Sequence, residues 1–342
     1  KKLHTFSYIP INNFKDWSPK SRVADERPFI KSTVNHVGNI EDNYFDFEDK
    51  SPFSEIDEWL DILEMPYKFY ENSFWLKGIY EQASKQGVGI LLNGQRGNWT
   101  VSWGPALDYQ AKLLRRGNIG KFLRELHLYS RNIGVKSSRV FPVVAKKAFP
   151  KLNRLFSSGE VVPYPVLINQ DFAKKFNVYR KLEEHDVDTT GLLNKSAYEI
   201  RKTQFEHPYY WSINGTYTTK LSLYHSLWDR DPTNDLRVVR FCLSVPETQF
   251  VQNGQDRSLI RRATEGLLPD NIRLNQRTRG LQGADGIQRM TADWNLFMSE
   301  MELVVKSDFI SEYLDIGVIK SAMERLKDNA LPEYVFHDDF RV

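Results

Sequence analysis

Only one cysteine occurs among the 342 residues, so an internal disulfide framework is excluded and a reducing, cytoplasmic location is predicted. That residue, Cys242, lies in the apolar run VVRFCLSVP, which favours a buried structural thiol over a nucleophile. No run of about 18 apolar residues is present, so we expect no transmembrane helix and no membrane partner. The first residues, KKLHTFSYIP, have no apolar stretch of signal-peptide length, so secretion is not indicated.

Metal and nucleic-acid signals are also lacking. The seven histidines show no metal-ligand spacing and form no cluster with cysteine, so we predict no metal site built from protein side chains. The aromatic stretch HPYYWSINGTYTTKLSLYHSLW has Lys220 as its only Lys or Arg. It therefore favours core and helix packing over a platform for stacked bases, and we expect no nucleic-acid partner.

The net charge of +3 conceals two strongly charged segments. Residues 112–154 contain twelve Lys or Arg and one acid, Glu125, whereas residues 41–61 contain nine acids and one base, Lys50. Each segment is interpretable as a solvated face of the protein. The basic segment is equally interpretable as a surface for a polyanion or an acidic peptide.

Hydrophobic patterning predicts an α/β protein. Up to residue 104 the order is a strand at 3–11, a helix ending near Gly38, a helix starting near Ser54, a helix at 72–87 and a strand at 88–93. This alternation is typical of a parallel sheet with crossover helices. From about residue 105 strand signals are scarce and helical patterns dominate, apart from a proline-rich stretch at 141–167 that we expect to be irregular.

The segment GILLNGQRGNWTVSWG places a glycine-bearing turn directly after a short apolar strand. Such a turn before a helix directs free backbone N–H groups at an anion, with Gly94 and Gly97 permitting close approach and Arg96 adding positive charge. The alternative interpretation is an ordinary structural turn.

A second segment, RSLIRRATEGLLPDNIRLNQRTRGLQGAD at 257–285, is rich in arginine. Arginines in a glycine-broken loop can neutralise a polyphosphate leaving group. A solvated basic helix and loop is the alternative, and spacing alone does not separate the two.

Four stretches, in this order, resemble the synthetase domain of the asparagine synthase (glutamine-hydrolysing) family, an ATP pyrophosphatase or PP-loop type of domain. LHTFSYI resembles the family's second sheet strand, near the adenine, and LLNGQRGNWTVSWG resembles a loop written Gly-Glu/Gln-Gly-Gly-Asp/Asn-Glu. DPTNDLRVVRFCLSVPE resembles a helical segment that ends in a Leu-Pro-like turn. GQDRSLIRRATEGLLPDNIRLNQRTRGLQGAD resembles the C-terminal signature, and the four stretches together span most of residues 3–290.

The resemblance implies a parallel-sheet PP-loop core of the adenine nucleotide alpha hydrolase-like type, followed by a mainly helical C-terminal part. It implies a ligase that forms an amide bond and uses ATP and Mg²⁺ as cofactors. A carboxylate is activated as an acyl-adenylate with release of pyrophosphate, and an amine then attacks it.

Carried over by position, the resemblance also implies site residues. The nucleotide-binding candidates are Tyr8, which would lie by the adenine, and Asn93, Gly94 and Gly97 of the loop. The catalytic candidates are Gln95, at the family's Glu/Gln position, and Arg277 or Arg279, because the family's usual lysine is absent.

Two departures concern the extent of the match. The family's Ser-Gly-Gly-x-Asp-Ser pyrophosphate loop, and the glutaminase domain that supplies ammonia, have no counterpart in this sequence. We therefore expect residues 1–110 to form a partial nucleotide-binding core without its first strand and pyrophosphate loop, and residues 111–342 to complete the synthetase domain. On this expectation the chain is an incomplete, inactive piece whose amine comes from the missing glutaminase domain or another source.

A third departure concerns the substrate. Asparagine-forming enzymes carry acids at the positions of Gln95, Asn98 and Trp99, and Asn98 is a poorer Mg²⁺ ligand than a carboxylate. Three hypotheses stay open: conversion of aspartate or a related small carboxylate to its amide, a lasso-peptide macrolactam cyclase that acts on a precursor peptide, and a non-catalytic remnant that keeps only the fold.

Overall fold

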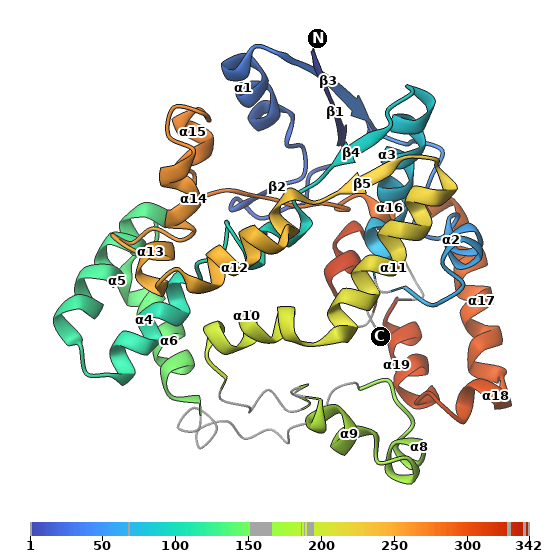
Figure 1. The fold of residues 1–342 in the computed structure, drawn as a ribbon. Helices are drawn as coiled ribbons and strands as arrows, with labels where there is room; N and C mark the ends of the chain where they lie inside the picture. The colour runs from blue at the N-terminus through green and yellow to red at the C-terminus, as the bar shows by residue number, and fades with distance from the viewer. Residues whose placement is uncertain are drawn as a thin grey trace.

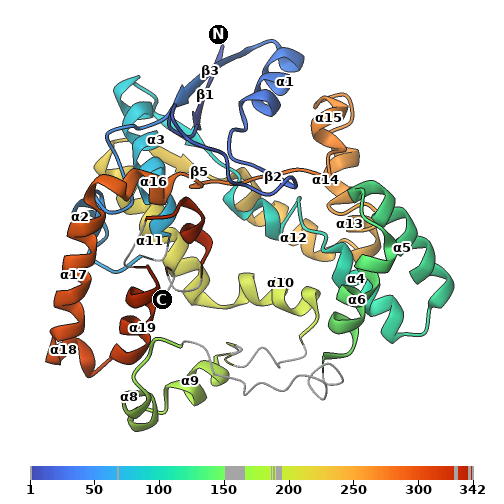
Figure 2. The same ribbon diagram turned by 180° about the vertical axis from the view of Figure 1, so that it is seen from behind.

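The computed structural model describes residues 2–67, 69–150, 166–185, 187, 189, 195–326, 330–337 and 340. Figure 1 shows the strands near the top of the molecule, between two groups of helices. One group contains α4–α6 and α13–α15, and the other contains α2, α3, α11 and α16–α19; the view from behind in Figure 2 shows the same division.

The first structural unit is a parallel strand pair joined by a helix. Strand β1 (Leu3–Tyr8) and strand β3 (Ile40–Phe45) are paired in parallel along their whole length. The connecting helix α1 (Arg27–Val37) has a proline in its first turn and ends at Gly38, whose φ of 73° lies in the left-handed region that glycine tolerates. The predicted strand at the start of the chain and the helix that ends near Gly38 are confirmed.

Strand β3 was not predicted. Its sequence, IEDNYF, carries two adjacent acids and gives no strong strand signal. One of them, Asp42, is neutralised by Lys31 of α1 at 2.5 Å. The segment is extended because β1 supplies its hydrogen-bonding partner, which a local pattern does not reveal.

A second parallel pair joins the two halves of the chain. Strand β4 (Ile90–Leu92) pairs with β5 (Trp228–Arg230), so the mainly helical half contributes a strand to the α/β part. A third, short pair joins β2 (Arg22–Val23) to β6 (Arg279–Gly280). The α/β class with parallel strands is confirmed. Among the described residues the strands form three two-stranded sheets rather than one continuous sheet. The division of the chain at residue 110 stays a prediction.

Helices make up most of the remaining structure. Those before residue 150 are α2 (Ile56–Leu63), α3 (Ser73–Lys85), α4 (Ala106–Arg115), α5 (Ile119–Ile133) and α6 (Ser137–Ala148). Those in the middle are α8 (Gln170–Lys175), α9 (Val178–Glu184), α10 (Ala197–Glu206), α11 (Pro208–Tyr224) and α12 (Leu236–Ser244). The last are α13 (Glu247–Phe250), α14 (Ser258–Ala263), α15 (Asp270–Arg273), α16 (Gly286–Met290), α17 (Trp294–Lys306), α18 (Asp308–Ser311) and α19 (Ile316–Leu326). Short 3₁₀ helices are η1 (Tyr70–Asn72), η2 (Gln95–Trp99), η3 (Pro232–Asn234), η4 (Thr291–Asp293) and η5 (Pro332–Phe336).

The proline-rich stretch expected to be irregular is helical where the structure describes its start. Helix α6 continues through Pro142 to Ala148 because its apolar side packs against α4 and α5. Residues 151–165 of this stretch lie outside the described ranges. In those ranges the structure has no helix that combines the length and the hydropathy needed to cross a bilayer.

The largest cluster of buried apolar residues joins α4, α5 and α6 to the segment around α13. Cys242 belongs to this cluster and is fully buried, and burial raises the pKa of its thiol. The prediction of a buried structural cysteine is confirmed. A second cluster packs α2 and α3 against α11, and its main members are Trp59, Leu63, Tyr80 and Leu221.

His225, at the C-terminal end of α11, gives stability a defined pH dependence. Burial lowers its pKa below the ordinary value of 6.5, and its buried Nε2 atom has no hydrogen-bond partner among the described residues. The unfolded chain therefore binds a proton more readily than the folded protein. We expect the free energy of unfolding to fall as the pH drops below about 6.5, toward the lowered folded-state pKa. The free energy of unfolding, measured with urea from pH 5 to 8, should change less with pH in His225→Gln than in the parent protein. An equal pH dependence in the two proteins would contradict this account.

Candidate active site around the 93–104 loop

The loop begins where β4 ends. Asn93 still donates its backbone N–H to the carbonyl oxygen of Arg230 in β5 at 3.0 Å, and the chain then turns into η2. Helix α4 begins only at Ala106, so a 3₁₀ helix, rather than an α-helix, follows the strand. The loop therefore lies at the carboxyl ends of two parallel strands, the usual position of ligand sites in open α/β sheets.

The backbone of this loop does not form an anion cradle. The N–H of Gln95 donates to the side-chain oxygen of Asn93 at 3.0 Å, and that of Gly97 donates to the carbonyl of Gly94 at 2.9 Å. The N–H of Arg96 donates to a carboxylate oxygen of Asp231 at 2.7 Å. The expectation that free loop N–H groups point at a phosphate is wrong for this conformation, because three successive donors are already used.

Two aspartates at the end of β5 hold the loop in place. Besides Arg96, Asp231 accepts from the N–H of Thr233 at 2.8 Å. Asp229 accepts from the amide of Asn93 at 2.5 Å and from the hydroxyl of Tyr80. Burial raises the pKa of Asp229. Neither aspartate was predicted from the sequence; the available signal was the pair of acids in WDRDP, directly before a proline.

Removing the Asp231 carboxylate should loosen the loop. In Asp231→Asn only one side-chain oxygen remains to accept from both Arg96 and Thr233, so one N–H loses its partner. A hydrogen bond to a charged acceptor contributes about 1.5–3 kcal/mol, so we expect a loss of about that size in unfolding free energy. Hydrogen exchange at the Arg96 amide should accelerate by more than exchange in α5. Unchanged Arg96 protection would contradict the anchoring role.

The Arg96 side chain is directed into the protein. Its guanidinium donates to the carbonyl of Gln204 at 2.7 Å and lies 4.9 Å from the ring centre of Phe205. The residue is only 6% exposed, and burial lowers its pKa. The expectation that Arg96 offers its charge to an anion is therefore wrong; it ties the loop to α10 and α11.

The loop separates two cavities. A cavity of about 250 Å³ is lined by Asn93 and Gln95 together with Asp229 and Asp231. The side chain of Gln95 also hydrogen-bonds the hydroxyl of Tyr217, whose pKa burial raises to about 12. Two acids and two arginines, Arg96 and Arg230, thus line the cavity that contains Gln95.

On the other side lies a cavity of about 570 Å³, which we call the arginine cavity. Its walls come from the second half of the loop, from α4 and α10, and from the start of α14. The loop residues that line it are Asn98, Trp99, Ser102, Trp103 and Gly104. Gly94 and Gly97 line neither cavity.

Gly104 brings the loop against the arginine-bearing segment. Its φ is 144°, and a Cβ atom there would lie 2.5 Å from the carbonyl oxygen of Phe250 and 2.7 Å from the backbone nitrogen of Arg257. Only glycine allows this approach. The contact places Arg257 at the rim of the loop.

Arg257 and Arg279 both line the arginine cavity, and both also line an adjoining cavity of about 550 Å³. Arg279 lies 3.3 Å from a carboxylate oxygen of Asp256, which also pairs with Arg261 at 2.8 Å. Among the described residues, the Arg257 guanidinium makes no hydrogen bond or salt bridge; burial lowers its pKa, and the nearby Asp256 carboxylate opposes that shift. The φ of Arg257, 51°, is unusual for a residue other than glycine. A half-buried cation that makes no hydrogen bond is the strongest anion-binding feature beside the loop.

In the sequence Arg257 is one member of an arginine-rich stretch, and the predicted catalytic residue was Arg277 or Arg279. The structure separates those two. Arg277 points away from the loop, and its Nε donates to the carbonyl of Asn132 at the end of α5 at 3.3 Å. Of the two candidates only Arg279 lines the arginine cavity.

Tyr8 lies apart from both cavities beside the loop. Its hydroxyl donates to Asp285, and its ring stacks on Trp75 with centres 5.6 Å apart. Asp285 is fully buried and is held by Arg289 at 2.7 Å. Burial raises the pKa of Tyr8, and the nearby Asp285 carboxylate adds to the effect. The structure thus joins Tyr8 to a buried network at the end of β1.

Arg201 of α10 binds the second half of the loop and was not predicted from the sequence. It is fully buried, donates to the carbonyl oxygens of Trp99 at 2.8 Å and Cys242 at 3.0 Å, and lies 4.5 Å from the Trp103 ring centre. Burial lowers its pKa to about 10. The carbonyl of Cys242 lies in the last turn of α12, where the helix dipole favours a cation. The position of Arg201 therefore depends on three segments, α10, the loop and α12, and no local sequence pattern connects them.

These residues fit a phosphate-bearing ligand better than a free metal ion. Arg257 and Arg279 present positive charge at the arginine cavity, which suits the phosphates of ATP. In the described ranges no three His, Cys, Asp or Glu side chains gather as ligands for a metal ion. Mg²⁺ is usually held by one or two carboxylates together with substrate phosphates, so the residues fit Mg²⁺ only as part of a nucleotide complex.

Comparison with known proteins identifies the family of the chain. Residues 1–295 match the family model described as asparagine synthase, a range that includes the 93–104 loop and both arginines of the cavity. No curated protein matches the chain. A match over most of the chain shows the family and, at a general level, the chemistry of ATP-dependent amide-bond synthesis. The chain belongs to the asparagine synthase family.

Proposed function

We propose that this chain carries the site of an ATP-dependent amide-forming reaction that proceeds through an acyl-adenylate, with the arginine cavity as the place of carboxylate activation. The observation that carries the proposal is the unpaired guanidinium of Arg257 beside Arg279 at the rim of the loop. In adenylation a carboxylate oxygen bonds to the α-phosphorus of ATP and pyrophosphate leaves. Negative charge grows on the departing pyrophosphate, and the two guanidinium groups stabilise it.

The proposal assigns separate roles to the two sides of the loop. Arg257 and Arg279 stabilise phosphate charge in the arginine cavity. Gln95 and Asn93 line the smaller cavity, where Asp229 and Asp231 can accept from the N–H groups of an amine substrate and Arg96 and Arg230 balance their charge. ATP and Mg²⁺ are the implied cofactors, and the protein is proposed to act in the cytoplasm.

The acyl substrate has two candidates. A small carboxylate such as aspartate is one. The second, a side-chain carboxylate of a peptide that is closed into a macrolactam, is favoured by the apolar wall of the arginine cavity. Trp99, Trp103 and Ile200 contribute to that wall, which is larger and more apolar than a bare aspartate requires.

Exchange of labelled pyrophosphate into ATP tests the proposal with the protein that carries this chain. Exchange that requires an added carboxylate supports adenylation, and comparison of aspartate with acidic peptides identifies the substrate class. Exchange that aspartate supports and no acidic peptide supports would exclude the peptide candidate. The absence of exchange with every carboxylate, in a protein shown to be folded, would leave the chain as a non-catalytic member of the family.

A further inference from the structure

Tyr129, in the last part of α5, lines the arginine cavity, and the reaction proposed above assigns it no part. Only 7% of the residue is exposed, and its ring belongs to the cluster of buried residues that joins α4, α5 and α6. Its hydroxyl makes no hydrogen bond to a described residue, and the hydroxyl oxygen is not one of the enclosed polar atoms that lack a partner. The hydroxyl is therefore open to a ligand in the cavity that Tyr129 lines.

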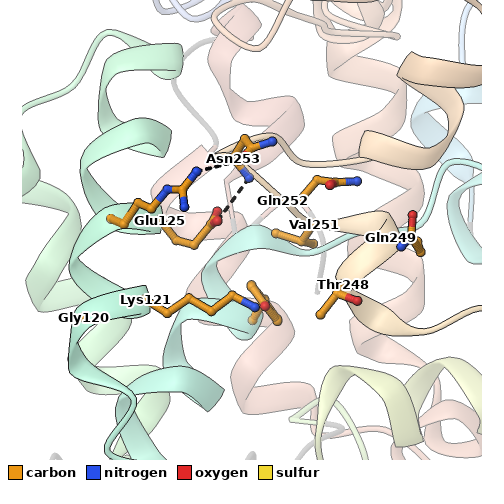
Figure 3. A pocket seen from close by; sticks show the side chains of 10 residues that line it. Gly120, Lys121, Glu125, Thr248, Gln249, Val251, Gln252 and Asn253 are labelled. Carbon is orange, nitrogen blue, oxygen red and sulfur yellow. Dashed lines mark hydrogen bonds between the residues drawn. The ribbon is translucent and has the colours of Figure 1, made fainter.

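Packing against the segment that follows α13 fixes the position of Tyr129. Figure 3 shows Glu125, one turn earlier in α5, turned toward Asn253 of that segment. The Glu125 carboxylate accepts from the backbone N–H groups of Asn253 at 3.1 Å and Gly254 at 2.7 Å. Gly254 has a φ of 68°, and a Cβ atom there would lie 2.2 Å from the backbone nitrogen of Tyr129, so only glycine allows this approach. The protein thus holds Tyr129 in place without a ligand.

The charges near the hydroxyl suit an anionic oxygen. Asp256, Arg257 and Arg279 line the same cavity, and the Asp256 carboxylate pairs with Arg261 at 2.8 Å and with Arg279 at 3.3 Å, so its charge is compensated. Burial raises the pKa of the Tyr129 hydroxyl; the Asp256 carboxylate adds to the rise, and Arg279 opposes it. Tyr129 therefore keeps its proton at neutral pH and can donate a hydrogen bond beside two guanidinium groups.

Folding by itself gives no reason for a hydroxyl at this position. Removing a hydroxyl from water without supplying a new hydrogen bond costs free energy. Phenylalanine would place the same ring in the cluster without that cost. Stability alone therefore favours phenylalanine at position 129, whereas a ligand that accepts from the hydroxyl favours tyrosine.

We propose that Tyr129 is a further catalytic residue of the arginine cavity and donates a hydrogen bond to a phosphate oxygen of ATP beside Arg279. This inference rests on the proposed amide-forming reaction. During adenylation a carboxylate oxygen forms a bond to the α-phosphorus, the bond from that phosphorus to the bridging oxygen breaks, and the electron pair of that bond stays on pyrophosphate. Tyr129 transfers no proton; its hydroxyl stabilises the negative charge that grows on the departing group.

Tyr129→Phe, in the protein that carries this chain, tests the hydroxyl. The rate of carboxylate-dependent ATP–pyrophosphate exchange at saturating substrates should fall about 10- to 100-fold, the effect of losing one hydrogen bond to a charged acceptor. The KM for the carboxylate should not change. Calorimetric titration with pyrophosphate should show binding weaker by about tenfold. Urea unfolding should show a stability equal to or above that of the parent protein, because the folded protein loses no hydrogen bond.

The matched control is Tyr109→Phe. Tyr109 of α4 is 4% exposed and belongs to the same cluster, but it is not among the residues that line the arginine cavity. Its loss of a hydroxyl should change neither exchange nor pyrophosphate binding. Equal effects of the two substitutions would show that a general change in the cluster, rather than the Tyr129 hydroxyl, is responsible.

The outcomes separate this inference from the proposed function. If the parent protein shows no exchange with any carboxylate, the proposed function fails, and the pyrophosphate titration still decides whether Tyr129 contacts phosphate. Equal exchange and equal pyrophosphate affinity in Tyr129→Phe and the parent protein would refute the inference. A higher KM for the carboxylate at an unchanged saturating rate would place the hydroxyl at the acyl substrate and overturn the assignment to phosphate. Slower exchange together with lower stability would show a structural part instead.

Discussion

Arg257→Gln is expected to reduce carboxylate-dependent ATP–pyrophosphate exchange by about 10²–10³-fold while the protein stays folded. The guanidinium of Arg257 is half-buried, lines the arginine cavity and makes no hydrogen bond or salt bridge among the described residues, so its N–H donors are available to a ligand. Glutamine keeps a polar but shorter side chain and removes the positive charge that stabilises departing pyrophosphate. The exchange rate at saturating ATP is the measurement, with unfolding by urea as the check on folding.

Two further variants make this result specific. Arg257→Lys should recover part of the rate, because an ammonium keeps the charge without the planar fork of a guanidinium. Arg180→Gln removes an exposed arginine of α9 whose one salt bridge among the described residues is with its helix neighbour Glu184, and it should leave exchange unchanged. Equal exchange in Arg257→Gln and the parent protein would show that the cavity is not the site of activation. A deeper loss in Arg277→Gln than in Arg279→Gln would reverse the choice between those two residues.

Arg201→Met is expected to lower the free energy of unfolding by about 2–5 kcal/mol. The substitution leaves the carbonyl oxygens of Trp99 and Cys242 buried without their donor and removes the cation from the Trp103 ring. Each buried group left unsatisfied costs about 1–3 kcal/mol, and loss of the cation–π contact adds to this. Urea denaturation followed by circular dichroism gives the measurement.

The matched control is Arg237→Met on α12. This arginine is 90% exposed and pairs with Asp235, so its removal should change the unfolding free energy by less than about 0.5 kcal/mol. Because Arg201 holds the second half of the loop, Arg201→Met should also increase hydrogen exchange at the amides of 99–103 more than in α3. Similar losses in the two variants would contradict the clamping role.

Local signals predicted the elements that need no distant partner. The helix that ends at Gly38 and the strand before the loop follow from glycine, proline and apolar spacing within a few residues. Strands β3 and β5 were missed because each is short or acidic and becomes a strand only by pairing in parallel with a segment far away in the sequence. The same reason explains why the second half of the chain was read as helical alone.

The candidate site, too, was predictable from the sequence only in part. The loop at 93–104 and the arginine-rich stretch at 257–285 were recognisable as separate segments, and the order of four such segments pointed to the asparagine synthase family, which the family match over 1–295 confirms. Which arginine faces the loop was not recognisable. Arg257, Arg277 and Arg279 have the same chemistry, and only the contact at Gly104 and the turn of the chain decide that Arg277 faces α5 instead.

By itself the sequence determined the α/β class, the single buried thiol, the family and the position of the loop, because each depends on residue type and spacing over short distances. Tertiary structure decided what the loop does. Its backbone donors are taken by Asn93, Gly94 and Asp231, its own arginine is buried against α10, and the free cation beside it comes from the start of α14. Hydrogen bonds and charge pairs form between whichever groups folding brings within reach, so a residue's availability is a property of its neighbours in space rather than of its motif.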